Sequence, residues 1–154
     1  MDHALPTSSA ATVPPGPAAA LDKAALQEAL TSLFAPWVQD LHLQVERFGP
    51  SEVTLRLPHD ERLSRTGGML CGQAMMAAAD TAMVLALICH FGSFRPCTTV
   101  QLSSSFLKPL SGQDALVQAR VIRAGKSTAF GEIELLGADD GKSVLRASTV
   151  YALL

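Results

Sequence analysis

The stretch CGQAMMAAADTAMVLALICHF, residues 71–91, decides the fold of this chain. A helix over these residues is apolar on every side, so other elements must surround it. One carboxylate, Asp80, lies in the middle of the run, and no Lys or Arg occurs between Arg65 and Arg95 to neutralise it. The apolar run is shorter than the about 20 residues that a membrane span needs, and Asp80 interrupts it, which favours a buried helix of a soluble domain.

The segments on both sides of this helix predict a sheet. Residues 21–34 have apolar residues at helical spacing, with Asp22 near the start and Pro36 closing the helix. The order helix, two strands, long helix, four strands predicts an α+β fold, in which a curved antiparallel sheet of about five or six strands wraps the long helix. We expect a second subunit to cover the remaining face of that helix. The predicted strands, which show alternating polarity, are residues 41–45, 53–57, 97–107, 115–123, 127–137 and 143–153.

Length and composition exclude several classes of protein. With 154 residues, 48% of them hydrophobic, the chain is large enough for one core, and we expect a disordered tail over 1–20 and a single domain over 21–154. A formal net charge of -2 favours neither nucleic acid nor an anionic membrane as a partner. The three cysteines lack CxxC spacing and the four histidines lack metal-ligand spacing. We therefore expect reduced thiols, a cytoplasmic protein and no bound metal.

Asp80 has two interpretations. A buried carboxylate without a cation either loses much of its hydration energy or takes up a proton, so its presence needs an explanation. Asp80 either anchors the helix through hydrogen bonds to backbone, to Thr81 or to serine hydroxyls of the sheet, or acts as a general base or nucleophile in a pocket.

The start of the same helix offers a second element. The segment TGGMLCGQ, residues 66–73, places three glycines just before and at the helix N-terminus, where free N–H groups favour negative charge. Such an end can be an oxyanion hole for acyl transfer, or an ordinary glycine-rich turn. Gly72 and Asp80 are eight residues apart, about 12 Å along a helix, which is too far for both to act on one carbonyl. If they cooperate, they come from different subunits of a two-fold dimer.

Several motifs together resemble the hotdog-fold acyl-CoA thioesterases of the PaaI-like (phenylacetic-acid-degradation) group. In that group His-Gly-Gly opens the helix, and an Asp follows eight residues after the first of these glycines. This chain has Cys71 and Gln73 in place of the His and the second Gly, and Arg65 where some members have Asn. The matching motifs, within roughly residues 40–154, are MLCGQAMMAAADTAM (69–83), TTVQLSSSFLKPLSG (98–112), VIRAGKSTAFGEIEL (121–135) and SVLRASTVYALL (143–154).

The resemblance implies a hotdog fold, a homodimer or a dimer of dimers, and hydrolysis of an acyl-CoA without a cofactor, CoA being part of the substrate. It implies that Asp80 is the catalytic carboxylate, acting as base or nucleophile. The backbone N–H of Gln73, with Gly72 beside it, would polarise the thioester carbonyl, and the hydroxyl of Thr99 would hold the water or the carboxylate.

Further residues are expected to contact the substrate, because flexible thioethers suit an acyl group and cations suit the CoA phosphates. They are Arg65, Cys71, Met76, Lys108, Arg123 and Lys126. A non-catalytic acyl-CoA-binding or regulatory hotdog module is the alternative function. A hotdog hydratase is a third hypothesis, but its catalytic His is not evident in the sequence.

Overall fold

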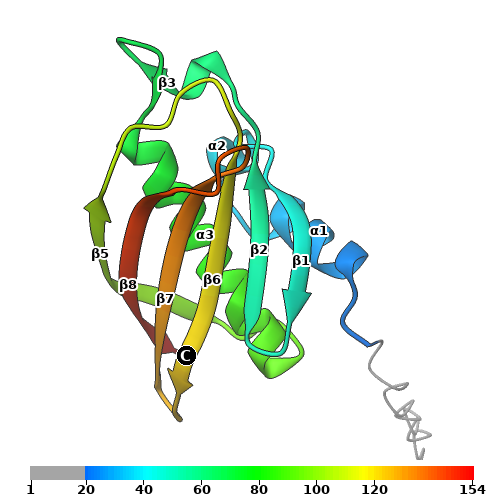
Figure 1. The fold of residues 1–154 in the computed structure, drawn as a ribbon. Helices are drawn as coiled ribbons and strands as arrows, with labels where there is room; N and C mark the ends of the chain where they lie inside the picture. Colours follow the sequence, from blue (N-terminus) through cyan, green and yellow to red (C-terminus); the bar gives the residue numbers. More distant parts are fainter. Residues whose placement is uncertain (1–19) are drawn as a thin grey trace, which may run out of the picture.

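One antiparallel sheet and one long helix form the centre of the molecule. The computed structural model describes residues 20–154, and its main sheet has six strands in the order β1-β2-β6-β7-β8-β5. The sheet curves around α3 (Gly72–Phe91), as Figure 1 shows. The hotdog arrangement expected from the sequence is therefore confirmed, while the predicted tail, except for Ala20, lies outside the described residues. The strands are β1 (Gln44–Gly49), β2 (Glu52–Leu57), β5 (Cys97–Phe106), β6 (Ala115–Ala124), β7 (Thr128–Gly137) and β8 (Ser143–Leu153).

The long helix packs closely against the sheet. Met83 of α3 is fully buried and lies over Gly131 of β7, where a Cβ atom would come within 2.3 Å of the Met83 sulfur. A glycine at this position therefore lets helix and sheet approach each other. α3 is long and apolar enough to cross a membrane, but 61% of its most apolar window is buried inside the domain, as expected of a core helix.

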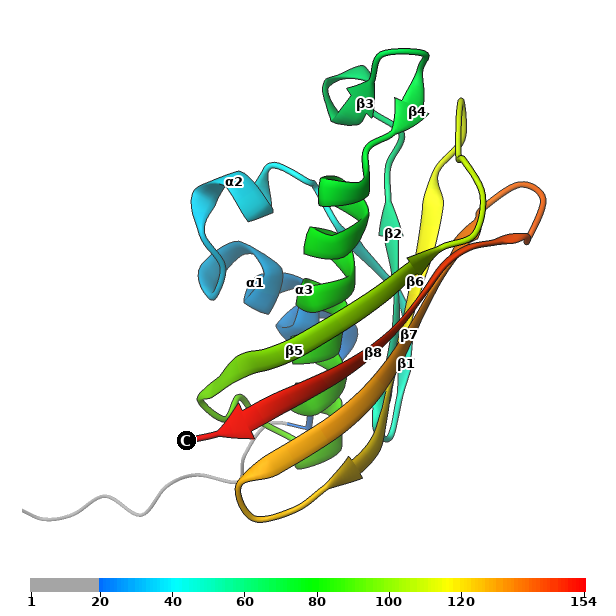
Figure 2. The ribbon, with the colours of Figure 1, turned by 90° about the vertical axis from the view of Figure 1, so that its left-hand side faces the viewer.

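Two N-terminal helices lie on the side of α3 away from the sheet (Figure 2). They are α1 (Lys23–Ser32), which buries Leu26 and Leu30, and α2 (Pro36–Gln39). The side chain of Asp22 caps α1 by accepting a hydrogen bond from the Ala25 N–H at 2.8 Å. Pro36 begins α2 at a position where a missing N–H is harmless. The chain's own helices thus cover part of the α3 face that the sheet leaves open, and a second subunit is expected only over the rest.

The two edges of the sheet differ. At the β1 edge, the amide of Gln27 in α1 donates to the Leu43 carbonyl at 3.0 Å and accepts from the Val45 N–H at 2.9 Å. The other edge is β5, in which most side chains are exposed or half-buried, including Val100 with 63% of its surface exposed. A bulge interrupts the pairing of β5 with β8 just after Thr99. One edge is therefore partly covered, and the other is open.

Local backbone conformation explains where the structure departs from the predicted segments. The first strand begins at Gln44 rather than at residue 41, because His42 has a left-handed φ of 52°. Gly67 and Gly68, with φ of 96° and 72°, form the turn between two short strands, β3 (Ser64–Arg65) and β4 (Met69–Leu70), which follow the 3-10 turn η1 (Glu61–Leu63). Of the three glycines expected at the helix start, Gly72 alone belongs to α3.

Candidate active site

Asp80 lies on the less buried face of α3, and two hydroxyl groups bind the same carboxylate oxygen. Thr99 Oγ1 donates to Asp80 Oδ1 at 2.8 Å. The Tyr151 hydroxyl also donates to Oδ1 and lies 3.0 Å from the Asp80 backbone carbonyl. The hydroxyl of Thr81, which was one expected partner, instead donates to the Ala77 carbonyl at 2.8 Å. Asp80 is thus bound by the sheet and not by its own helix.

The β5–β8 ladder brings the two hydroxyl groups together. Thr99 and Tyr151 are directly opposite each other across the two strands, so both side chains point to the same face of the sheet, toward α3. The bulge after Thr99 bends β5 beside the Asp80 carboxylate. Bulges of this kind often occur next to active sites.

Sequence reasoning found Asp80 and Thr99 but missed Tyr151. Alternation along β8 places residues 145, 147, 149, 151 and 153 on the buried face, and Tyr151 is 1% exposed. A phenol at a buried strand position needs a hydrogen-bond partner. This requirement, together with the lone carboxylate of the helix, was the signal that could have identified it.

The charge of Asp80 affects its neighbours. No ion pair joins Asp80 to a Lys or Arg within residues 20–154. Burial, followed by the charge of Asp80 and the hydrogen bond to it, raises the pKa of Tyr151 far above its ordinary value. Burial and the same charge raise the pKa of the Cys97 thiol. Both neighbours therefore stay protonated at neutral pH, and Tyr151 remains a hydrogen-bond donor.

The helix start lies apart from Asp80 within one chain. Gly72 and Gln73 are the first two residues of α3, and the N-cap residue Cys71 makes no side-chain hydrogen bond to them. Their N–H groups have no acceptor within the helix. A Cβ atom on Gly72 would lie 3.1 Å from the Phe106 ring, so the side chain of β5 covers this glycine closely. The eight intervening residues keep these donors about 12 Å from Asp80 along the helix.

The predicted substrate-binding cations lie at two opposite ends of the sheet. Lys108 follows the end of β5 and pairs with Asp140 at 3.3 Å, whereas Arg123 and Lys126 lie in the β6–β7 hairpin at the end nearer Thr99. Sequence reasoning missed Arg95, which donates to the Lys126 carbonyl at 2.8 Å and adds a cation to that end.

The remaining predicted contacts lie along α3 and the segment before it. Met76 is half-buried one turn before Asp80, and Cys71 is half-buried at the helix start. Arg65 is exposed in β3, where its guanidinium lies 3.5 Å from the Met69 sulfur. Within residues 20–154, no three His, Cys, Asp or Glu side chains lie close enough together to hold a metal ion.

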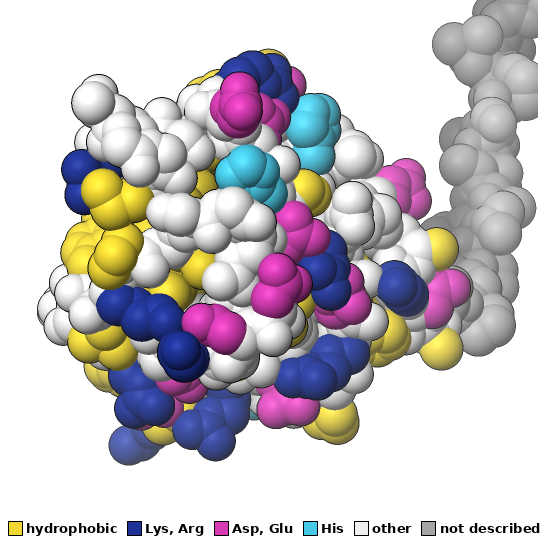
Figure 3. Space-filling model, turned by 45° about the horizontal axis from the view of Figure 1, so that its top comes forward, with side chains coloured by type: hydrophobic (Ala, Val, Ile, Leu, Met, Phe, Trp, Pro, Cys, Tyr) yellow, Lys and Arg dark blue, Asp and Glu magenta, His cyan; other side chains and the backbone are white. Residues whose placement is uncertain are grey.

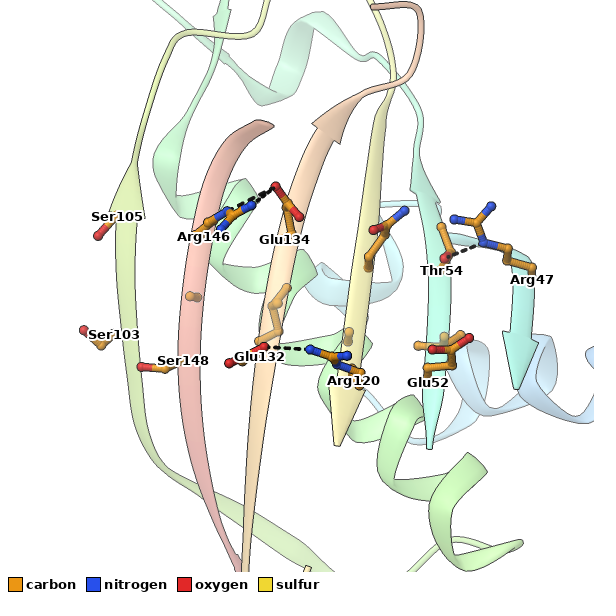
Figure 4. A pocket seen from close by; sticks show the side chains of 15 residues that line it. Arg47, Glu52, Thr54, Ser103, Ser105, Arg120, Glu132, Glu134, Arg146 and Ser148 are labelled. Carbon is orange, nitrogen blue, oxygen red and sulfur yellow. Dashed lines mark hydrogen bonds and ion pairs between the residues drawn. The ribbon is translucent and has the colours of Figure 1, made fainter. Parts of the chain in front are cut away.

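A hollow of about 640 Å³ lies on the face of the sheet away from α3 (Figure 4). Three carboxylates line it: Glu132 and Glu134, which pair with Arg120 at 3.0 Å and Arg146 at 3.1 Å, and Glu52, which is exposed and forms no ion pair among the described residues. Exposed ion pairs contribute little free energy, and an exposed carboxylate such as Glu52 lies in water and not in apolar surroundings like those of Asp80. The Asp80 cluster, and not this hollow, is therefore the candidate active site.

Comparison with known proteins agrees with this geometry. Residues 67–144, which include α3, Asp80 and Thr99, match the family model described as the thioesterase superfamily. A candidate esterase of Thermoplasma acidophilum is 25% identical over 108 residues, which is 69% of this chain and 81% of that protein.

Solved structures show the same fold. A protein of Silicibacter described as a candidate thioesterase is 30% identical, with a TM-score of 0.76 over 86% of this chain and 92% of that one. The PaaI protein of the E. coli phenylacetic-acid degradation operon shares the fold, with a TM-score of 0.73 at 16% identity over 86% of this chain and 94% of that one. The chain therefore belongs to the thioesterase superfamily and is a thioester hydrolase.

Proposed function

We propose that this protein hydrolyses an acyl-CoA thioester to the free acid and CoA, without a resident metal or cofactor, and that Asp80 performs the attack. The observation that supports this is the carboxylate itself: Asp80 stands in an apolar helix, makes no ion pair among the described residues, and has one oxygen bound by Thr99 and Tyr151. As a base, it would take a proton from water while the water oxygen attacks the carbonyl carbon. As a nucleophile, it would form an acyl anhydride that water then cleaves. In both routes the C–S bond breaks and the CoA sulfur takes up a proton.

A second copy of the chain completes the site in this proposal. The less buried face of α3, with Gln73, Ala77, Asp80 and Val84, lies beside the open strand β5. Hydrophobic side chains gather at the left of Figure 3, the side on which Figure 1 places β5, whereas charges of both signs cover the middle of the view. A two-fold dimer across this surface would bring the helix start of one subunit to Asp80 of the other. The partner's N–H groups would then polarise the thioester carbonyl.

The two cation groups also fit a shared site. Arg95, Arg123 and Lys126 lie near the Asp80 end of one chain, and Lys108 lies near the helix-start end of the partner in such a dimer. These cations would hold the phosphates of CoA. Met76, half-buried one turn from Asp80, would contact the acyl group.

The test is the release of free CoA, followed with a thiol reagent, from a panel of aliphatic and aryl acyl-CoA esters. Asp80→Asn keeps the size and the hydrogen-bond acceptor but removes the charge, so we expect turnover to fall by at least about 10³-fold while the fold and the oligomer persist. Ser148→Ala, on the outer face of β8, is the matched control and should retain activity.

The alternative, a non-catalytic acyl-CoA-binding module, makes a different prediction. It requires saturable binding of CoA esters with no CoA release at any chain length. An Asp80→Asn variant that hydrolyses as fast as the original chain would refute the role of Asp80 while leaving the thioesterase assignment intact.

A further inference from the structure

The two oxygens of the Asp80 carboxylate have different environments. Thr99 and Tyr151 both donate to Oδ1, and no hydrogen bond from residues 20–154 reaches Oδ2. Asp80 is half-buried and its Oδ1 already accepts from two donors, so Oδ2 is the oxygen left without a donor among these residues.

We propose that Tyr151 is a positioning residue which, with Thr99, fixes Oδ1 of Asp80 and so makes Oδ2 the oxygen that reacts. This proposal rests on the proposed function and adds to it a positioning residue, Tyr151, and a reacting atom, Oδ2 of Asp80. Tyr151 itself does not touch the substrate in this scheme. It acts by holding the carboxylate in one orientation.

The surroundings of Tyr151 suit this role. Its ring is 1% exposed, and the facing residue on β7 is Ala129, which is fully buried and small enough to leave room for the ring. The hydroxyl lies within reach of both Oδ1 and the backbone carbonyl of Asp80, so it links the side chain to the helix backbone. A phenol that stays protonated can only donate to the carboxylate, so Tyr151 supplies a hydrogen bond to Oδ1 at neutral pH.

Few other polar groups face the Asp80 carboxylate. Tyr151 faces it from β8, and Thr99 and Cys97 face it from β5, of which the thiol of Cys97 stays neutral. The helical neighbours three and four positions away are apolar: Met76, Ala77, Met83 and Val84. Among the described residues, the orientation of the carboxylate therefore depends on the donors Thr99 and Tyr151.

The first test compares Tyr151→Phe with the original chain in the CoA-release assay. Phe keeps the ring and deletes only the donor, so we expect kcat to fall roughly 10- to 100-fold, the worth of a hydrogen bond to a charged group. We expect KM to change much less, because Tyr151 does not touch the substrate.

A merely structural role for the phenol would disturb substrate binding as well as turnover. An unchanged kcat, or a KM that rises as much as kcat falls, therefore overturns the proposal. Ser148→Ala, on the same strand but facing away from α3, should leave both kcat and KM unchanged.

The second test needs no activity. The chain contains a single tyrosine, so absorbance at about 295 nm reports the ionisation of Tyr151 alone, above the ordinary value of about 10. In Asp80→Asn the carboxylate charge is gone, and we expect the phenolate to form at a pH lower by at least about one unit than in the original chain.

A titration that does not move while circular dichroism shows both proteins to be folded would show that the phenol does not face the carboxylate, and would overturn the proposal even if Tyr151→Phe fails to fold. If instead the titration moves but no thioester is hydrolysed by the original chain, the proposed function fails, and the positioning role fails with it. The contact between Tyr151 and Asp80 would stand in that case. The two failures are therefore distinguishable.

Discussion

Burial controls the chemistry of individual side chains in this domain, and the thiol of Cys89 on α3 is a clear example. It is half-buried in the last turns of the helix, and loss of hydration raises its pKa to about 11. Its thiolate, the reactive form, is therefore scarce at neutral pH.

We predict that iodoacetamide labels Cys89 at pH 8 on the order of 10²-fold more slowly in the folded protein than in urea, where an ordinary thiol pKa of about 8.5 applies. Because the pKa of Cys89 is raised, the labelling rate of the folded protein should keep rising about tenfold per pH unit up to roughly pH 10. The labelling rate in urea should level off above about pH 9. Peptide mass spectrometry measures the labelling. Steric protection alone would lower the rate without steepening its pH dependence, so parallel profiles would contradict this prediction.

At the same scale, the sequence identified Asp80 because a lone charge in an apolar run is visible without a structure. It identified Thr99 only through resemblance to a family, because a threonine in a strand is ordinary. Tyr151 escaped because its role depends on the pairing register of β5 and β8, which places it opposite Thr99. The pairing register of two strands about 50 residues apart cannot be predicted from the sequence of either strand alone.

The contact between α3 and the sheet is the clearest feature at the scale of elements. Gly131 has an ordinary strand conformation, so an alanine there would by itself stabilise the fold slightly by restricting the unfolded chain. The Met83 side chain, however, occupies the space that the new methyl group needs. Because Met83 is fully buried, it can move only by disturbing its neighbours.

We predict that Gly131→Ala lowers the free energy of unfolding by about 1–3 kcal/mol, the usual cost of overpacking a core. In a Met83→Ala background, which itself costs about 2–5 kcal/mol, the same Gly131→Ala change should cost clearly less. Urea unfolding of the four proteins of this cycle measures the coupling. If the losses in unfolding free energy of the two substitutions simply add in the double variant, the two side chains do not compete for space.

The elements themselves were largely predictable, and the exceptions have local causes. Alternating polarity located all six strands of the main sheet, and residues 143–153 match β8 at both ends. The pair Gly67-Gly68 left two interpretations open in the sequence, because glycines suit both a helix start and a tight turn. Here positive φ angles assign them to the turn between β3 and β4. The helix α2 was missed because a single turn has too little periodicity to detect.

At the scale of the whole molecule, the distance between the helix start and Asp80 decides how many chains make one site. Gln73→Pro removes the N–H of the second helical residue, at a position where proline is compatible with the helix. On the proposed mechanism, both Gln73→Pro and Asp80→Asn homodimers should be nearly inactive.

We predict that mixing these two variants, after subunit exchange, restores about a quarter of the original activity, because half of the dimers are mixed and each has one intact site of two. The CoA-release assay measures the recovery, and light scattering confirms that each variant is still dimeric. A site made within one chain would show no recovery, since each chain would retain its own defect. A monomeric original chain would contradict the shared site directly.

The Gln27 amide on the β1 edge has a consequence for assembly. A sheet with two bare edges can add neighbours on both sides and grow into an endless ribbon. In this chain α1 occupies backbone groups at the start of one edge strand, and β1 itself is bulged between Val45 and Arg47. If the sheet pairs through an edge, β5 is the edge that a partner can join, and such pairing would stop after one partner. The side chain of a single glutamine would then help to favour a closed pair over a fibre.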